Sequence, residues 1–390
     1  MRVLGLMSGT SADGVDAVLA EFSGRLDRPR WRILASASLP YAPDLHRQLV
    51  ALGQGQPLAA AAVLDLAEAV TEAQATAARA ADPDGLAELV GCHGQTVWHR
   101  PPEPGRRGLS WQLLLGPLLA HQLECPVVFD FRSADLALGG QGAPLVPAAD
   151  AALLGGIGGW RALLNLGGIA NLTLLPPSSG PQRGAPVQGW DCGPANTLLD
   201  LAVQQFSEGQ RRFDADGAWA RSGRIDEARI QIWLQEAYVR QAPPKSTGRE
   251  LFGGSDLQRR LAELAGGPGG TPPDPADALA TLTAFTAAVV AADLERGTRP
   301  LELLVAGGGA RNGFLMEQLR RRCRGTAVVP LAELGIADEQ REALAFALLA
   351  WWHRQGHPGS LPSVTGAAKP SLLGVRADPP GQGQGQGLEL

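Results

Sequence analysis

The chain opens with a short apolar run that ends in a hydroxyl-rich turn. Residues Val3 to Met7 predict a buried strand, Ser8 to Ser11 a tight turn, and Val15 to Phe22 a returning strand. Walker and dinucleotide-binding loops lead into a helix and need a glycine spacing that is missing here. The fold must therefore accommodate strand, turn, strand. The turn amides and hydroxyls could hold an anion and Asp13 and Asp16 could face a magnesium ion, although an ordinary hairpin turn fits as well.

Two further glycine clusters follow predicted strands. Gly167-Gly168 separates the strands 162–166 and 169–175, which repeats the opening pattern and suggests two lobes of similar plan, each offering a backbone loop to one anion between them. Gly307 to Gly309 follows a strand over 301–305 and precedes a helix. Glycines there would let a flat ligand such as a nucleoside lie against the backbone at a helix start.

Three polar side chains follow strand ends in the first part of the chain. His93 and Gln95 come after a short strand over 86–90, and Arg132 comes after a strand that starts at residue 126, with a helix over 111–123 between them. Ligands of open α/β sheets collect at such ends, so these residues are candidates for binding hydroxyl, amide or anionic groups. A polar loop with one structural histidine is the alternative for His93.

Asp191 lies in the most distinctive motif, Gly189 to Asn196. The motif separates a short extended run from a helix over 197–206. A carboxylate at such a junction points into a cleft, where it can act as a base or a metal ligand. The alternative is a helix cap, for which Asp is favoured. Asn196 is better placed to cap this helix, which leaves Asp191 free for chemistry.

The stretch 244–250 imitates part of a Walker loop. It contains Lys245, Ser246, Thr247 and Gly248 but has no glycine before the lysine, so we reject that interpretation. Lys245 is nevertheless one of only two lysines in the chain, which keeps a functional role open.

Composition excludes several classes of protein. A chain of 390 residues with 45% hydrophobic and 19% charged residues can fill two domains. A net charge of −5 with no basic face predicts no nucleic-acid partner. No apolar run approaches the ~20 residues of a membrane span, and the first apolar run is too short for a signal peptide. The four cysteines show no metal or disulfide spacing, so we expect a cytoplasmic protein.

Several long motifs occur in an order that is similar to one enzyme family. They are Met7 to Asp16, His93 to Thr96, Asp130 to Arg132, Gly139 to Pro147, Leu164 to Leu172, Asp191 to Asn196 and Gly307 to Asn312. Over about residues 1 to 376 the chain resembles the anhydro-N-acetylmuramic acid kinase family. Cys192, beside Asp191, departs from the family pattern and puts the rate in question.

The resemblance implies an α/β fold of the actin-like ATPase (ribonuclease H-like) type, with two lobes and a nucleotide cleft between them. Residues 1–138 with about 363–377 would form the N-terminal lobe, and residues 139–362 the C-terminal lobe. The Gly-Gln-rich segment 378–390 is predicted to be a disordered tail.

The implied activity is an ATP-dependent phosphorylation of 1,6-anhydro-N-acetylmuramic acid, coupled to hydrolytic opening of its anhydro bridge, in peptidoglycan recycling and amino-sugar catabolism. Asp191 matches the catalytic base. The residues matching the ATP site are Gly9, Thr10, Ser11, Ala12, Asp13, Gly14, Val15, Asp16, Gly167, Gly168, Gly307, Gly308, Gly309 and Asn312. Asp13 would hold Mg²⁺, and the sugar would meet His93, Gln95, Arg132 and Glu342. Glu342 could instead be an exposed residue of a first helical turn. The resemblance also suggests a homodimer.

Two other functions share this fold. One is a nucleotide-gated, actin-like binding or filament protein, and the other is a related kinase for another amino sugar or polyol. A filament protein has no evident need for Asp191 together with His93, Gln95 and Arg132. This combination therefore favours a kinase.

Overall fold

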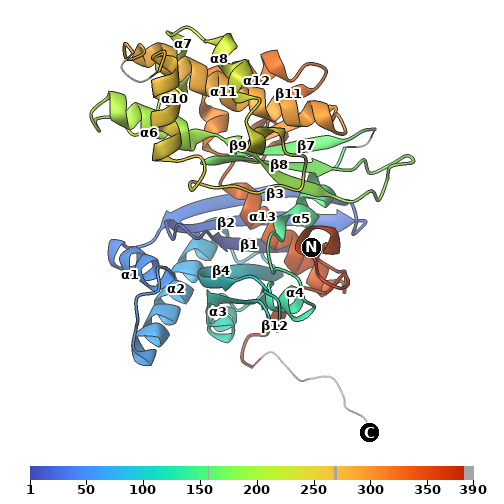
Figure 1. The fold of residues 1–390 in the computed structure, drawn as a ribbon. Helices are drawn as coiled ribbons and strands as arrows, with labels where there is room; N and C mark the ends of the chain where they lie inside the picture. The colour runs from blue at the N-terminus through green and yellow to red at the C-terminus, as the bar shows by residue number, and fades with distance from the viewer. Residues whose placement is uncertain (157, 268–269, 382–390) are drawn as a thin grey trace. The chain divides into compact units, whose positions relative to one another are not determined.

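The computed structural model describes residues 1–156, 158–267 and 270–381 (Figure 1). They form two compact units, of which unit 1 comprises Met1–Leu154 and Glu339–Leu390 and unit 2 comprises Gly155–Asp338. Each unit has its own sheet and its own hydrophobic core. The predicted tail lies largely in residues 382–390, outside the described residues.

Unit 1 combines strands with flanking helices. Its strands are β1 (Arg2–Ser8), β2 (Gly14–Gly24), β3 (Pro29–Pro40), β4 (Leu89–Arg100), β5 (Leu109–Leu113), β6 (Val127–Phe129) and β12 (Val375–Ala377). Its helices are α1 (Pro43–Gly53), α2 (Ala60–Ala81), α3 (Gly116–Leu123), α4 (Ser133–Ala137), α5 (Val146–Leu154), α13 (Gln340–Arg354) and α14 (Pro362–Thr365).

The sheet of unit 1 has the strand order β12-β6-β4-β1-β2-β3, and β5 pairs with β4. Strands β1, β2 and β3 form an antiparallel meander, whereas β4 runs parallel to β1 and β6 parallel to β4. The burial of these strands follows from their positions in the sheet, because β1 is an interior strand and β3 is an edge strand. The central strand β1 is apolar and buried, while β3 alternates between more and less exposed residues along its length.

Unit 2 has a second sheet and a larger set of helices. Its strands are β7 (Arg161–Leu166), β8 (Ile169–Leu175), β9 (Gln188–Pro194), β10 (Glu302–Ala306) and β11 (Ala327–Pro330). Its α-helices are α6 (Asn196–Phe206), α7 (Ala218–Arg221), α8 (Glu227–Trp233), α9 (Ala237–Arg240), α10 (Gly254–Leu264), α11 (Pro275–Arg296) and α12 (Gly313–Arg322). Short 3₁₀ helices are η1 (Ala215–Gly217), η2 (Gly308–Arg311) and η3 (Leu331–Leu334).

The sheet of unit 2 repeats the plan of unit 1. Its order is β11-β10-β7-β8-β9, with β7, β8 and β9 antiparallel to their neighbours, β10 parallel to β7, and β11 parallel to β10. In both units a three-stranded meander is extended beyond its first strand by two parallel strands. This is the ribonuclease H-like plan, and it confirms the predicted α/β class and the two lobes of similar plan.

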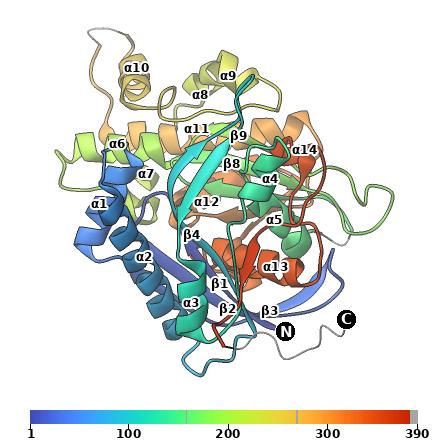
Figure 2. The ribbon, with the colours of Figure 1, turned by 90° about the horizontal axis from the view of Figure 1, so that it is seen from below.

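Glycines allow α13 to pack closely on the sheet of unit 1. A Cβ atom at Gly5 of β1 would overlap Ala343 O, and one at Gly91 of β4 would overlap Phe346 O. Residues next to these glycines point to the opposite face, where they share a core with α2. Figure 2 shows α2 and α13 on opposite sides of the strands. The sheet is therefore covered on both faces.

The long helix α11 is the centre of unit 2. Asp274 caps its first turn by accepting from Ala276 N and Asp277 N, and Pro275 occupies the first turn. By length and composition this helix could cross a membrane, but 89% of its most apolar window is buried in the structure. It is a core helix that packs on α6, α12 and β9.

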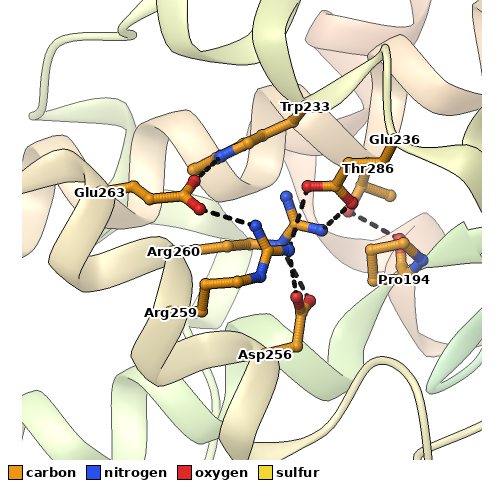
Figure 3. Close-up of polar contacts among 8 residues, drawn as sticks. All are labelled: Pro194, Trp233, Glu236, Asp256, Arg259, Arg260, Glu263 and Thr286. Carbon is orange, nitrogen blue, oxygen red and sulfur yellow. Dashed lines mark hydrogen bonds and ion pairs between the residues drawn. The ribbon is translucent and has the colours of Figure 1, made fainter.

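A buried arginine joins α10 to the helices beside it (Figure 3). Arg260 is fully buried, and its guanidinium lies 4.7 Å from the ring centre of Trp233 and 4.4 Å from that of Phe285. It pairs with Asp256 and Glu236, each at 2.8 Å. Because a buried charge needs such partners, this network fixes α10 against α8 and the start of α9.

Several predicted bounds differ from the structure. The strand expected over 86–90 extends as β4 to Arg100, because its second half pairs with β5. This pairing also replaces the first part of the helix expected over 111–123 with β5, so α3 begins at Gly116. The lobe boundaries expected at 139 and 362 differ from the division at 154/155 and 338/339. The reason is that α5 packs on α13, and α13 packs on β1 and β4.

The close packing of α13 predicts an effect on stability. Replacing Gly91 by alanine should lower the free energy of unfolding of unit 1 by about 1–3 kcal/mol, because the added methyl group meets the α13 backbone. Chemical denaturation monitored by circular dichroism measures this change. Gly53→Ala is the control, since an added Cβ there would lie at an ordinary 3.7 Å from Val97 O. Equal stabilities of the two variants would contradict the interpretation.

Candidate active site

The turn between β1 and β2 is held by side chains from elsewhere in unit 1. Ser8 Oγ is buried and lies 2.9 Å from Gly14 O, 2.8 Å from Tyr41 Oη and 2.5 Å from Gln95 Oε1. Gln95 Nε2 donates to Gly9 O at 3.0 Å. The amide of Gln95, predicted to contact the sugar, is thus used to hold the turn.

Two more contacts fix the second half of this turn. Ala12 adopts a left-handed backbone conformation with φ of 54°, and its carbonyl oxygen accepts from His46 Nδ1 at 2.8 Å. Tyr41 N donates to Asp13 O at 3.0 Å. Neither His46 nor Tyr41 was predicted from the sequence, because no motif surrounds either residue.

The turn presents polar side chains to solvent. Thr10, Ser11 and Asp13 are exposed, whereas Asp16 is half-buried and accepts from Ser38 Oγ at 2.6 Å. Desolvation raises the pKa of Asp16, and the Ser38 hydrogen bond opposes this change. Within the described residues, no group of three or more His, Cys, Asp or Glu side chains is arranged to hold a metal ion. The exposed carboxylate of Asp13 has the oxygen-donor chemistry that Mg²⁺ prefers.

His93 and Arg132 form a pair in unit 1. Both Arg132 Nε and Nη2 lie within 3.1 Å of His93 Nε2, and Arg132 Nη1 donates to Gly142 O at 2.7 Å. His93 is buried within β4 rather than beyond a strand end, next to Gly94 with φ of 75°. Burial, followed by the charge of Arg132, lowers the pKa of His93 to about 3. The ring is neutral, so Nε2 accepts from Arg132 and Nδ1 donates to Gly94 O.

This arrangement orients Arg132 and leaves part of its guanidinium available. Three of its five N–H groups are used by His93 and Gly142. Glu342 lies in the first turn of α13, where part of its surface is exposed while burial of its carboxyl group raises the pKa of that group. The charges of Arg132 and Glu342 influence each other, so the structure brings these two predicted residues together.

Asp191 lies inside β9 of unit 2, where three donors hold its carboxylate. Asn171 Nδ2 donates to Oδ1 at 2.8 Å, Ser246 Oγ to Oδ2 at 2.9 Å, and Thr247 N to Oδ2 at 3.0 Å. The backbone is also fixed, since Tyr238 Oη donates to Asp191 O at 2.8 Å. Oδ1 accepts one of these bonds and Oδ2 two. A carboxylate oxygen offers about two acceptor positions, so Oδ1 is the better placed to accept a proton.

The neighbouring Cys192 points away from this carboxylate. Successive side chains of a strand face opposite sides, and Cys192 is fully buried in the core of unit 2. Burial, with the nearby charge of Asp293, raises its pKa well above the ordinary value. The residue at which this chain departs from the family pattern therefore lies on the face of β9 that packs into the core, and not on the face that carries the Asp191 carboxylate.

The turn at Gly167-Gly168 packs on the start of α6. Ala195 N and Thr197 N donate to Gly168 O at 3.0 and 3.1 Å, and Asn196 N donates to Gly167 O at 3.1 Å. The sequence had suggested that Asn196 caps α6, but its side chain does not cap this helix. Its side chain instead donates to Leu166 O at 2.9 Å, because the preceding turn lies within reach.

A cavity of about 360 Å³ lies beside the third glycine cluster in unit 2. Its lining includes Asn196, Leu199, Asp200, Phe213, Asp214, Asp216, Gly308, Arg311 and Asn312. Gly307 has a φ of 84°, and Asn312 caps α12 by accepting from Leu315 N at 2.9 Å. Burial raises the pKa of Asp200 to about 6. The glycine cluster predicted for a nucleoside therefore borders a cavity of ligand size.

Several residues around Asp191 were not predicted from the sequence. Asn171 is directly opposite Asp191 in the β8–β9 register, and its place among the chain's few asparagines was a usable signal. Ser246 and Thr247 lie in the segment rejected as a Walker loop. Their role depends on a contact between distant parts of the chain, which spacing alone does not reveal.

Two units that share the ribonuclease H-like plan define the class of the actin-like ATPase fold. A family model described as anhydro-N-acetylmuramic acid kinase matches residues 1–378. Anhydro-N-acetylmuramic acid kinases from Synechococcus sp. (strain CC9605) and Prochlorococcus marinus (strain MIT 9303) are 62% and 60% identical, each over 97% of this chain and all of the relative. The chain belongs to the anhydro-N-acetylmuramic acid kinase family.

Solved structures give a more distant similarity. A ROK family glucokinase from Streptomyces griseus, in complex with glucose and AMPPNP, is 17% identical with a TM-score of 0.37, over 91% of this chain and 100% of that one.

The neutral His93 predicts a pH-dependent stability. An unfolded histidine titrates near pH 6.5, so between there and about pH 3 the unfolded chain binds one more proton than the folded one at this site. Stability is thus lost as the pH falls. Between about pH 7 and about pH 5, protonation of His93 in the unfolded chain should lower the free energy of unfolding by about 2 kcal/mol. The variant His93→Gln should not show this loss.

The measurement is denaturant unfolding of both proteins at each pH. The glutamine amide oxygen can still accept from Arg132, so the variant retains this contact. If wild type and variant lose equal stability on acidification, His93 is not held neutral.

Proposed function

We propose that this protein hydrolytically opens 1,6-anhydro-N-acetylmuramic acid and phosphorylates it with ATP, giving N-acetylmuramic acid 6-phosphate. The observation that carries the proposal is the Asp191 carboxylate, fixed by three donors and with acceptor capacity at Oδ1. Family membership supplies the substrate class. The role is in peptidoglycan recycling and amino-sugar catabolism.

In the proposed reaction, Asp191 takes a proton from a water molecule that attacks the anomeric carbon. The bond between this carbon and the 6-oxygen breaks, and the ring opens. The freed 6-oxygen then attacks the γ-phosphorus of ATP, and the bond to ADP breaks. The first step thus produces the nucleophile of the second step within the same site. A positioned base of this kind accelerates a reaction on the order of 10²- to 10⁴-fold.

Unit 1 would bind the sugar and the phosphates. Arg132, oriented by His93, has N–H groups available for the acidic substituent of the sugar, and Glu342 lies near it. The amides and hydroxyls from Gly9 to Ser11 would hold the phosphates. Mg²⁺ held by Asp13 and the phosphates would neutralise charge that builds up during phosphoryl transfer.

Unit 2 would bind the nucleoside and carry the base. The cavity beside Gly308 has apolar walls at Leu199 and Phe213 for a flat ring, and carboxylates such as Asp200 that can accept from hydroxyl groups. Four free, buried cysteines are consistent with the cytoplasm as its location. The family resemblance suggests a homodimer.

The direct test combines purified protein with ATP, Mg²⁺ and the anhydro sugar. ADP and the 6-phosphate should appear together in equal amounts, and neither should form without the sugar. ADP release that is indifferent to the sugar would instead favour a nucleotide-gated binding or filament protein. Comparison with other amino sugars and polyols tests for a related kinase, which would turn over one of them faster.

Asp191→Asn should lower turnover by about 10²- to 10⁴-fold, because the amide cannot accept the proton from water. ATP binding should stay close to wild type, since Asp191 lies in β9 and not in the nucleoside cavity. Steady-state kinetics and nucleotide titration measure the two effects. Wild-type turnover in this variant would remove Asp191 from the mechanism.

A further inference from the structure

Lys245 has no part in the proposed reaction, yet its charge is fully buried. Its ammonium group lies 3.0 Å from Asp293 Oδ1, and both side chains are 0% exposed. It also lies 5.1 Å from the ring centre of Tyr238 and donates to Val239 O at 3.4 Å. Burying two charges is expensive, and such a pair adds little stability over apolar residues. A role in fixing one particular local geometry is a better explanation.

The geometry beside this pair is that of the Asp191 carboxylate. Asp191 N donates to Lys245 O at 3.1 Å, and the next two residues, Ser246 and Thr247, supply the two donors to Asp191 Oδ2. The segment 245–247 thus contacts Asp191 through its backbone and its donors, while the lysine side chain extends to Asp293 in α11.

Asp293 holds both chain segments that flank the carboxylate. Its Oδ1 accepts from Lys245, and its Oδ2 accepts from Trp190 Nε1 at 3.0 Å. Trp190 immediately precedes Asp191 in β9. One carboxylate of a core helix therefore fixes the strand that carries Asp191 and the segment that supplies two of its donors.

We propose that Lys245 is a positioning residue that, through its buried ion pair with Asp293, holds Ser246 and Thr247 in place and so aims the Asp191 carboxylate. The inference deepens the proposed function and rests on Asp191 being the base. Without the ammonium group, the segment 245–247 would lose its tie to α11. A displaced carboxylate would then meet its water at the wrong distance, while the nucleoside cavity would be unchanged.

Arg296 provides a matched control. Its Nη1 donates to the same two acceptors as Lys245, Asp293 Oδ1 and Val239 O, each at 2.7 Å. Arg296 lies on α11 itself, one-third exposed, and is not part of the segment that contacts Asp191. Removing either cation removes one positive charge from Asp293. Only the loss of Lys245 should release Ser246 and Thr247.

The experiment compares Lys245→Met and Arg296→Met by steady-state kinetics with ATP, Mg²⁺ and the anhydro sugar, alongside their thermal unfolding midpoints. Lys245→Met should lower kcat by about 10- to 100-fold with an unchanged KM for ATP, as is typical when a supporting group of a site is lost. Arg296→Met should keep kcat close to wild type. Equal losses of kcat in the two variants would overturn the proposal, because the effect would then come from the Asp293 charge alone.

A second variant decides the outcome if Lys245→Met does not fold. Ser246 is exposed, so Ser246→Ala removes one donor to Asp191 without touching the buried pair. Its kcat should fall with an unchanged KM for ATP. Wild-type kcat in Ser246→Ala would overturn the proposal, since the segment would then not position the carboxylate.

Combination with Asp191→Asn separates this proposal from the proposed function. If Lys245 acts through Asp191, adding Lys245→Met to Asp191→Asn should lower kcat no further. An additive loss would show that Lys245 acts elsewhere and would overturn the positioning role. Wild-type turnover in Asp191→Asn alone would instead remove the base on which both proposals rest.

Discussion

Each turn that carries a candidate binding loop depends on hydrogen bonds from a distant part of its own unit. A tight turn exposes carbonyl groups that must find donors when they are buried. In unit 1 the donors to the turn are Gln95, His46 and Tyr41, and in unit 2 they are the first amides of α6. These bonds fix the shape of the loops from within each unit, which reduces the entropy that binding must overcome.

The family, the α/β class and the repeated strand–turn–strand units could be predicted from the sequence. Strands β7 and β8 are mostly apolar and flank a glycine pair, a pattern that indicates two buried strands joined by a tight turn. The extent of β4 could not be predicted, because its second half is a strand only through pairing with β5. Local propensity does not contain that partner.

In the candidate site, too, some features could be predicted from the sequence and others could not. Asp191, Arg132 and His93 occur in motifs, so they could be named as candidates from the sequence. The contacts of amide side chains were harder to predict: Gln95, which the sequence assigned to the sugar, holds the turn between β1 and β2, and Asn196 contacts the preceding turn instead of capping α6. An amide side chain can donate and accept, so its role depends on which neighbours the fold brings near.

The burial of every cysteine has a consequence for how this protein tolerates oxidants. Thiols react as thiolates, and burial raises the pKa of Cys92, Cys125 and Cys323 to about 12 and that of Cys192 well above its ordinary value. The sulfur next to Asp191 in sequence is thus shielded both by its direction and by its protonation. Peroxide or alkylating reagents should reach this position only after unit 2 opens, so resistance to such reagents reports on the folding of that unit.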